Sequence, residues 1–206
     1  MIICFISTAV VVALCICFYD RLLAICISKL LFTNSTYSKY ASDIPDMLLL
    51  IVCGITAFAF IAYRIRIKKK LFDKHTEFFH LIMYAVPASY VVKSLLKCLF
   101  GRTNTREWLL HPESYGFHWF QGYWLNAGFP SGHMAVFTTL AVSLWRFYPR
   151  CRVIYSIYLL TMAVALIATN YHFISDVIAG AYVGMVVEAC LFKSLGRQQL
   201  IQVRHG

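Results

Sequence analysis

The chain contains few charged residues for its length. Asp, Glu, Lys and Arg make up 14% of its 206 residues, and Asp and Glu together account for nine of them. A soluble protein of this size would need more polar surface. Hydrophobic residues make up 60% of the sequence, and the mean hydropathy is +0.68. Because the apolar residues come in runs about as long as a bilayer is thick, this composition predicts a protein that spans a membrane several times.

Cysteines spaced for metal binding are also missing. The eight cysteines lie in or beside apolar runs, and none pairs with nearby histidines in a metal-binding pattern. Cys15 and Cys17 are too close together for a zinc knuckle. We therefore interpret the cysteines as small buried hydrophobic residues and expect no metal site.

A cleavable signal peptide is not indicated. The first apolar run lacks a basic start, and no clear small-residue cleavage site follows it. We predict that this run is a retained helix from about Ile2 to Tyr19, and we leave open an extension past Asp20 and Arg21 to Phe32. The two adjacent charges either pair at a membrane boundary or face the interior of the bundle.

Five further apolar runs complete the predicted fold. After a polar loop over Thr33–Asp46, they are expected at about Met47–Tyr63, Thr76–Phe100, Ser131–Phe147, Val153–Thr169 and Asp176–Phe192. The chain is therefore predicted to be one all-α domain over residues 1–206, an integral membrane bundle of six transmembrane helices in which residues 1–46 form the first span and an outer loop. Gly180 and Gly184 form a small-residue packing face on the last span.

The distribution of basic residues predicts the orientation of this bundle. Residues 64–74, between the second and third spans, carry six Lys and Arg. Placing them on the cytoplasmic side gathers 12 of the 19 Lys and Arg on that side, as the positive-inside rule expects. The net charge of +10 is thus explained without a nucleic-acid partner. Alternation of the spans then places these residues together at the outer face: Lys97, Arg102, His133, His172 and Asp176.

Two histidine motifs lie at this outer face. His133 ends the sequence Pro130-Ser131-Gly132-His133, at the predicted start of the fourth span. Asp176 follows His172 by four residues, so the two side chains would share one face of a helix. A histidine held by a carboxylate, with a second histidine near it, is suited to moving a proton and to acting as a nucleophile.

Three stretches of the chain together resemble the signature motifs of the type 2 phosphatidic acid phosphatase superfamily. They are Lys97–Arg102, Pro130–His133, and His172 with Asp176. Members of that superfamily are integral membrane phosphatases and phosphotransferases with six spans. The resemblance covers roughly residues 76–192 and places the catalytic motifs within residues 93–180. It implies an enzyme that acts on a lipid phosphate in the bilayer.

The resemblance also implies a role for each motif residue. His172 would attack phosphorus and form a phosphohistidine, Asp176 would fix the tautomer of His172, and His133 would protonate the leaving oxygen and then activate water. The residues that would bind the phosphoryl group are Lys97, Arg102, Ser131 and Gly132. Because these cations and the amides at a helix start supply a positive field, we expect neither a metal nor another cofactor.

The sequence departs from the family pattern at two arginine positions. The first motif of the family reads Lys-x6-Arg-Pro, but the last two places here hold Asn104 and Thr105. The third motif usually has Ser-Arg six residues ahead of its histidine, where this chain has Ala165 and Leu166. Two phosphate-binding arginines are therefore missing at their usual positions.

Other cations at the outer face could replace these arginines. We hypothesise that Arg102 does so, with Arg106 or Lys93 as further candidates, because arginine presents a planar fork suited to phosphate. Lys93 lies one turn below Lys97. The long segment Gly101–Gly128 that carries both arginines is rich in aromatic residues, and we predict an ordered loop at the headgroup layer.

These features predict a phosphohydrolase that removes phosphate from a lipid phosphate or lipid diphosphate through a phosphohistidine. The resemblance suggests phosphatidate, phosphatidylglycerophosphate, polyprenyl diphosphate or lipid A phosphates as substrates. A lipid phosphotransferase is an alternative, since some relatives of that kind also lack the third-motif arginine. A catalytically inactive lipid-binding membrane protein is the second alternative. The expected location is the inner membrane of a bacterial cell, with several spans and the site on the periplasmic face.

Overall fold

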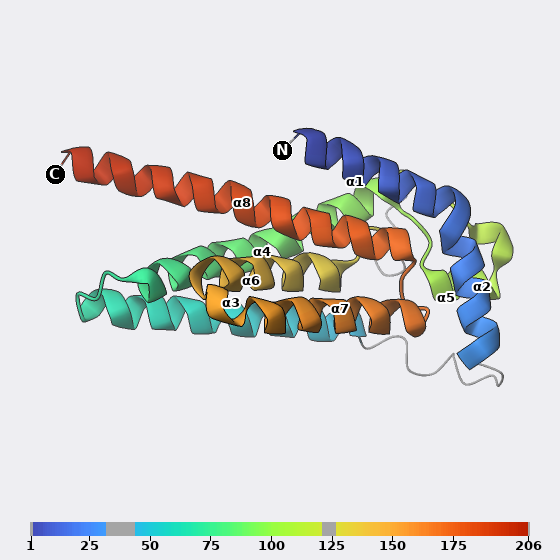
Figure 1. The fold of residues 1–206 in the computed structure, drawn as a ribbon, viewed down its shortest axis with the longest axis horizontal. Helices are drawn as coiled ribbons and strands as arrows, with labels where there is room; N and C mark the ends of the chain where they lie inside the picture. Colours follow the sequence, from blue (N-terminus) through green and yellow to red (C-terminus); the bar gives the residue numbers. More distant parts are fainter. Residues whose placement is uncertain (1, 32–43, 121–126, 206) are drawn as a thin grey trace.

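The computed structural model describes residues 2–31, 44–120 and 127–205, which fold almost entirely into helices (Figure 1). The long helices are α3 (Ile44–Lys68), α4 (Lys74–Phe100), α6 (Gly132–Phe147), α7 (Arg152–Ala168) and α8 (Ile174–His205). Shorter elements connect them: α5 (Thr105–Leu110) and the 3-10 turn η3 (Pro112–Ser114) between α4 and α6, and the 3-10 turn η4 (Pro149–Cys151) between α6 and α7. The predicted all-α membrane bundle is confirmed.

The first apolar run continues as a helix well beyond Tyr19. It consists of α1 (Ile2–Leu14), a π-helical segment η1 (Cys15–Tyr19) and α2 (Asp20–Leu31). The chain changes direction between α1 and α2 (Figure 1), as π-helical insertions commonly cause. The longer of the two boundaries left open by the sequence is thus the observed one.

Five helices within the described ranges are long and apolar enough to cross a membrane. They cover Ile3–Leu30, Met47–Lys68, Lys74–Phe100, Pro149–Ala168 and Ile174–Gly196. The predicted fourth span forms α6, which has 16 residues, whereas transmembrane helices usually need about 17–25. Six spans therefore stay a prediction.

The predicted loop over Thr33–Asp46 is wrong at its end. Residues 32–43 lie outside the described part of the chain, but α3 already begins at Ile44. The sequence Ile-Pro-Asp was interpreted as part of a loop because proline breaks helices. Pro45, however, stands in the first turn of α3, where a helix needs no amide hydrogen from it.

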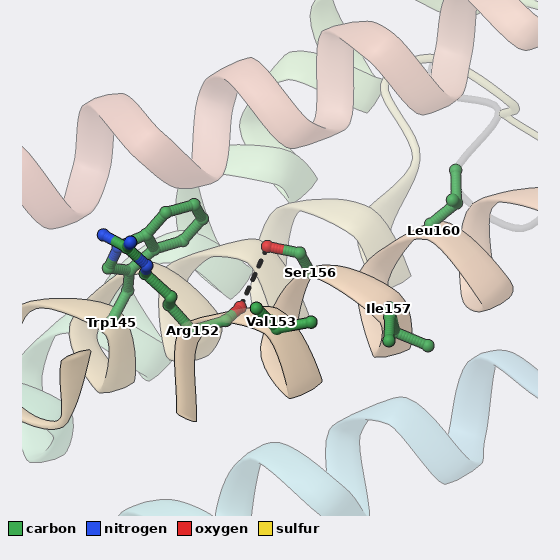
Figure 2. Close-up of a pocket in the computed structure, with 6 residues that line it drawn as sticks. All are labelled: Trp145, Arg152, Val153, Ser156, Ile157 and Leu160. Atoms are coloured by element: carbon green, nitrogen blue, oxygen red, sulfur yellow. Dashed lines mark hydrogen bonds between the residues drawn. The ribbon is translucent and has the colours of Figure 1, made fainter. Parts of the chain in front are cut away.

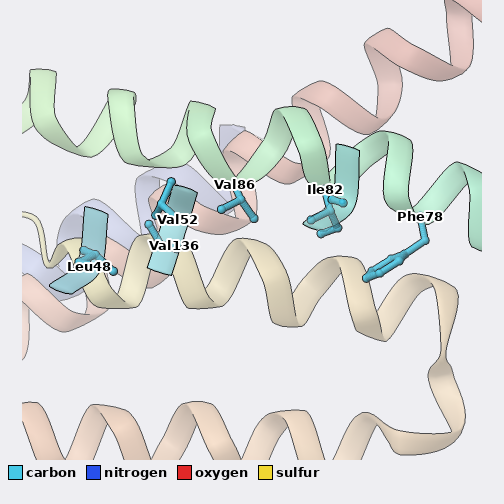
Figure 3. Packing of buried hydrophobic residues seen from close by; sticks show 7 residues of the cluster. Leu48, Val52, Phe78, Ile82, Val86 and Val136 are labelled. Carbon is cyan, nitrogen blue, oxygen red and sulfur yellow. The ribbon is translucent and has the colours of Figure 1, made fainter. Parts of the chain in front are cut away.

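The main hydrophobic core lies between α3, α4 and α6. It is formed by Leu48, Val52, Ala59, Phe78, Ile82, Val86 and Val136, most of which are shown in Figure 3. Val86 and Val136 are completely buried at the centre of this cluster. Because these side chains come from three helices, the core packs α3 and α6 against the first half of α4.

Helices α6 and α8 contact each other through two glycines. A Cβ atom at Gly180 would overlap the Ser131 carbonyl oxygen, and one at Gly184 would overlap the Ala135 carbonyl oxygen. The Thr139 hydroxyl group donates a hydrogen bond of 3.1 Å to the Gly184 carbonyl oxygen across the same contact. The small-residue packing face predicted on the last span is thus the surface that packs on α6.

We predict that Gly184→Ala destabilises the protein more than any ordinary surface substitution. The added methyl group must push α8 away from the backbone of α6, and overpacking of this kind costs about 1–3 kcal/mol. Thermal unfolding in detergent measures the effect. Gly54→Ala is the matched control, because no atom lies within 4 Å of a Cβ at Gly54. Equal melting temperatures of the two variants would contradict the prediction.

The basic connections lie together at the opposite end of the bundle from the histidine motifs. The Arg66 guanidinium group contacts Asp73 at 2.7 Å and closes the turn between α3 and α4. His75 hydrogen-bonds the Tyr148 hydroxyl group, which joins this turn to the one between α6 and α7. Nearby, Arg146 forms a bidentate ion pair of 2.8 and 2.9 Å with the buried Glu188 of α8. The basic residues therefore concentrate at one end, as the sequence predicts.

Candidate active site

The two histidine motifs meet at the end of the bundle where α4 and α7 finish and where α6 and α8 begin (Figure 1). The Ser131 amide at the start of α6 donates a 3.0 Å hydrogen bond to the backbone carbonyl oxygen of Asp176 in α8. This bond joins segments that lie far apart in the sequence. The convergence expected from the alternation of spans is therefore present in the structure.

The turn before α8 positions His172. The amides of Tyr171 and His172 both donate to the Leu166 carbonyl oxygen, at 3.0 and 3.2 Å, and Asn170 adopts a positive φ of 50° to make the turn. Glycine and asparagine adopt this left-handed backbone conformation more readily than most other residues. The turn thus fixes the backbone of His172 directly beside the N-terminus of α8.

Asp176 is held in the first turn of α8 by its own backbone contacts. Its Oδ2 atom accepts a 3.0 Å hydrogen bond from the Phe173 amide, while the Asp176 amide donates 3.1 Å to the Phe173 carbonyl oxygen. The first of these bonds is the half of a capping box that an acidic residue in the first turn supplies, and a carboxylate there is also favoured by the helix dipole. The same Oδ2 atom lies 3.6 Å from Nδ1 of His172.

His172 is almost completely buried, with 3% of its surface exposed. Its Nδ1 atom has no hydrogen-bond partner among the described residues, because 3.6 Å to Asp176 is longer than a hydrogen bond. Burial lowers the pKa of His172 below its ordinary value of 6.5, and the positive charge of Lys97 acts in the same direction, whereas Asp176 opposes both. A neutral imidazole is therefore favoured, as a nucleophile requires.

His133 lies in the first turn of α6 and is half-buried. The ring of Tyr171 contacts both histidines, with its centroid 5.9 Å from that of the His133 ring and 4.9 Å from that of the His172 ring. His172, Lys97 and Lys93 are the titratable groups that act electrostatically on His133. His133 thus lies near His172, as predicted.

The start of α6 offers free backbone amides. Ser131 is the N-cap, and its hydroxyl oxygen accepts a hydrogen bond from the Met134 amide at 3.4 Å. The first backbone hydrogen bond within the helix runs from Ala135 to Ser131, so the amides of Gly132 and His133 precede it. Such amides at the positive end of a helix form a binding site for an anion.

Lys93 and Lys97 approach this helix start from α4. The ammonium group of Lys97 donates a 2.6 Å hydrogen bond to the Ala127 carbonyl oxygen, and the Lys93 ammonium lies 3.9 Å from the centroid of the Tyr90 ring. A Cβ atom at Gly132 would lie 3.1 Å from the Lys93 side chain. Gly132 therefore allows the apolar stem of Lys93 to pack against the start of α6.

Arg102 lies in a buried network rather than in an open cleft. The guanidinium group is 1% exposed, and its two terminal nitrogens donate to four acceptors: Asp176 Oδ1 at 2.6 Å, Ser175 Oγ at 2.6 Å, Asp20 Oδ2 at 2.7 Å and Tyr115 Oη at 3.3 Å. The four N–H groups of the two terminal nitrogens thus all have partners within the protein. These contacts disfavour the phosphate-binding role expected from the sequence.

Arg106 lies closer to the histidines than its place in the loop indicates. Its guanidinium group donates to the Thr169 carbonyl oxygen at 3.2 Å and lies 5.2 Å from the centroid of the Tyr171 ring. Because Tyr171 contacts both His133 and His172, Arg106 borders the site. Lys93 and Arg106 therefore remain the candidates for the missing family arginines.

Sequence reasoning missed the role of Asp20. Its carboxylate is 1% exposed and pairs with Arg102, so of the two positions considered for this charge the bundle interior is the observed one. A carboxylate inside an apolar run is a functional candidate by default, and this signal was available in the sequence. What the sequence could not show was its partner, 82 residues away.

A pocket along α7 lies away from these residues. Figure 2 shows an exposed pocket along α7, lined by Trp145, Arg152, Val153, Ser156, Ile157 and Leu160. It contains none of the predicted site residues. Within the described ranges no cluster of three His, Cys, Asp or Glu side chains is arranged to hold a metal ion.

Comparison with known proteins gives one match. The family model of the PAP2 superfamily matches residues 78–199, which is more than half of the chain. The matched segment contains both histidines, Asp176, Lys97 and Arg102, whereas Asp20 lies outside it. Neither the curated proteins nor the solved structures contain a significant match to this chain.

Proposed function

Because this chain belongs to the PAP2 superfamily, the type 2 phosphatidic acid phosphatases, we propose that it is a membrane phosphohydrolase that acts on a lipid phosphate or lipid diphosphate. Membership supports a phosphatase-type activity. The observation that supports the proposal most strongly is the convergence of His172, His133, Lys97 and the start of α6 at one end of the bundle. Together they supply a nucleophile, a proton donor, a cation and an anion site.

The first half of the proposed reaction forms a phosphohistidine. Since Nδ1 of His172 faces Asp176, the free Nε2 atom attacks phosphorus, and the nitrogen–phosphorus bond forms as the bond to the lipid oxygen breaks. His133 gives a proton to that oxygen, so the lipid leaves as an alcohol, or as a monophosphate when the substrate is a diphosphate. Asp176 stabilises the positive charge on the ring of His172.

The second half releases phosphate. His133, now neutral, takes a proton from water, and the water oxygen attacks phosphorus while the bond to Nε2 breaks. His172 returns to its neutral form and His133 to its protonated form. In both halves Lys97 and the amides at the start of α6 offset the charge on the phosphoryl oxygens.

We predict that Lys97→Met lowers kcat/KM by roughly 10²- to 10³-fold, the range for loss of one preorganised charge-stabilising group. The ammonium group is already oriented by its hydrogen bond to the Ala127 carbonyl oxygen, so it reaches the phosphoryl group without reorganisation. Steady-state phosphate release measures the change. Lys193→Met, 17 residues after Asp176 on α8, removes the same charge and should stay near wild type. A Lys97→Met enzyme with wild-type kcat/KM would exclude Lys97 from the site.

A lipid substrate and an outward-facing site complete the proposal. The site lies at one end of the bundle, whereas the basic turns lie at the other, which the positive-inside rule places on the cytoplasmic side. Exposed Trp119 and Phe120 near the site are suited to the headgroup layer. The substrate would therefore enter from the outer leaflet, which in a bacterial inner membrane faces the periplasm.

Phosphate release from a panel of lipids tests the function. The purified chain in detergent and EDTA would be given phosphatidate, phosphatidylglycerophosphate, polyprenyl diphosphate and lipid A, with a soluble phosphate ester for comparison. We expect release from at least one lipid, faster than from the soluble ester. No release from any lipid by folded protein would contradict the hydrolase proposal.

One observation favours a phosphotransferase as the second candidate. Leu166 occupies the place of the third-motif arginine, and its carbonyl oxygen holds the amide of His172. The site therefore lacks the arginine that the third motif of the family supplies, as in some relatives that pass phosphate to another lipid. Labelled phosphate that appears on an added acceptor lipid, instead of in water, would identify this reaction.

A further inference from the structure

A chain of charged groups joins the first helix to the candidate nucleophile. Asp20 at the start of α2 contacts Arg102 at 2.7 Å, Arg102 contacts Asp176 at 2.6 Å, and Asp176 lies 3.6 Å from His172. All four side chains are at most 3% exposed. Nothing in the family match covers Asp20, because the match begins at residue 78.

Asp20 also holds the start of α8 directly. Its Oδ1 atom accepts a 3.1 Å hydrogen bond from the Ser175 amide, and its Oδ2 atom accepts one from the Ser175 hydroxyl group. Ser175 is the neighbour of Asp176 in the sequence. A carboxylate from another helix therefore caps the helix that carries Asp176, and it does so beside Arg102.

The surroundings of this network are apolar and aromatic. The guanidinium carbon of Arg102 lies 4.6 Å from the ring centroid of Phe173, 5.3 Å from that of Phe117 and 5.7 Å from that of Tyr115. The Tyr115 hydroxyl group donates 3.0 Å to the Ile16 carbonyl oxygen in the π-helical segment of the first helix. Charges enclosed in this way act on one another strongly, because little water is present to screen them.

Arg102 divides its charge between two carboxylates. One terminal nitrogen faces Asp176 and the other faces Asp20. If Asp20 were neutral, the whole positive charge of Arg102 would bear on Asp176 alone, and less negative charge would remain to attract the proton on Nδ1 of His172. With Asp20 ionised, the three groups carry a net charge of one negative unit beside the imidazole ring.

We propose that Asp20 and Arg102 are positioning residues of this enzyme, an inference that rests on the proposed function. They fix Asp176 in place and leave it enough negative charge to hold His172 in its reactive tautomer and to stabilise the phosphohistidine. Neither residue contacts the phosphoryl group. The first helix, outside the matched segment, is then a functional part of the active site.

This proposal predicts opposite effects for the two residues. Asp20→Asn makes the net charge of the network zero, so the pKa of His172 should fall by about half to one unit. Arg102→Gln leaves two unpaired carboxylates, so the pKa of His172 should rise by a similar amount. The double variant restores the net charge of one negative unit, so the pKa should return toward the wild-type value. Lys97 and His133, which also act on the imidazole of His172, stay unchanged in all three variants, as does Lys93, which acts on His133.

The kinetic effect should fall on kcat rather than on KM. We expect Asp20→Asn to lower kcat roughly 10- to 100-fold, as loss of an outer partner of a functional histidine does at metal sites. KM should stay within about twofold, because the residue does not touch substrate. The acid limb of kcat/KM should shift with the pKa of His172, and using one substrate for all variants cancels the ionisation of the substrate.

Titration of the histidine ring signals by NMR, with His172→Gln to assign the His172 signal, measures the pKa of His172 without any need for turnover. Phosphate release on the fastest lipid of the panel gives kcat and KM. If the wild type releases no phosphate but the variants show the expected pKa shifts, the proposed function is rejected and the charge network is supported. Release by the wild type with unchanged pKa and kcat in both single variants would overturn the network.

Glu188→Gln is the matched control. It also removes a buried carboxylate of α8 that is paired with an arginine, Arg146 of α6, but 12 residues further along α8 than Asp176. We expect it to lower the melting temperature and to leave the pKa of His172 and kcat unchanged. If Asp20→Asn behaved like Glu188→Gln, losing stability alone, Asp20 would be a structural residue and the proposal would be wrong. If a single variant fails to fold, the charge-restoring double variant with a wild-type pKa still supports the proposal, and a shifted one contradicts it.

Discussion

Replacing His172 by glutamine should reduce phosphate release by about 10⁴-fold or more, the range for loss of a nucleophile from a two-step enzyme. Glutamine has no nitrogen that can attack phosphorus, so the covalent step disappears. The surroundings of His172 explain why no neighbour can replace it. The ring is buried, its Nδ1 atom faces Asp176, and its backbone is fixed by the Leu166 carbonyl oxygen.

Two measurements check this expectation. Steady-state release gives the rate, and rapid quenching with labelled substrate shows whether an acid-labile phosphoenzyme forms in the wild type and not in the variant. His111→Gln is the control, because His111 is 59% exposed and contacts acidic side chains of its own loop. A His172→Gln enzyme that retained a hundredth of the wild-type rate would exclude His172 as the nucleophile.

Asp176→Asn should have the second largest effect, a loss of about 10³- to 10⁴-fold in kcat with little change in KM. Exchange of the carboxylate behind a catalytic histidine for an amide costs about 10⁴-fold in serine proteases, because the imidazole is then held in the wrong tautomer. Here the amide would also contact Arg102, whose two terminal nitrogens offer only hydrogens. The replacement therefore disturbs both neighbours of the carboxylate.

Loss of stability must be separated from loss of chemistry in this variant. Asp176 also caps α8 and pairs with Arg102, so we expect a lower melting temperature as well. Rates are therefore compared at a temperature at which the variant is fully folded. Glu188→Gln, on the same helix, shows what a lost buried carboxylate does without contact with His172. An Asp176→Asn enzyme with a tenth of the wild-type kcat would contradict the proposed role.

The sequence predicts much of this site because its information is local. His172 and Asp176 lie close together, as their spacing of four residues predicts, although His172 lies in the turn before α8 and the two do not share a helix face as expected. The meeting of His133 with His172 follows from the alternation of apolar runs. Helix boundaries agree within a few residues wherever the polarity changes sharply, as at Phe100 and Phe147. Each of these inferences depends either on residues that are close together in the sequence or on the alternation of successive spans across the membrane.

The partner of Arg102 could not be predicted in the same way. The sequence shows a surplus arginine near a phosphate motif, and phosphate is the simplest partner for it. Asp20 lies 82 residues away, on a helix whose register is shifted by a π-helical segment, so no spacing rule connects the two.

The glycine contact between α6 and α8 sets the relative position of two catalytic groups along the bundle. His133 lies in the first turn of α6 and Asp176 in the first turn of α8, so their relative height depends on how the two helices are registered. Gly180 and Gly184 lock that register one and two turns inward. A slip of one helical turn would displace the two ends by about 5.4 Å and separate the proton donor from the nucleophile. The relative position of the two catalytic groups is thus set by a helix contact inside the bundle, one and two turns away from the site itself.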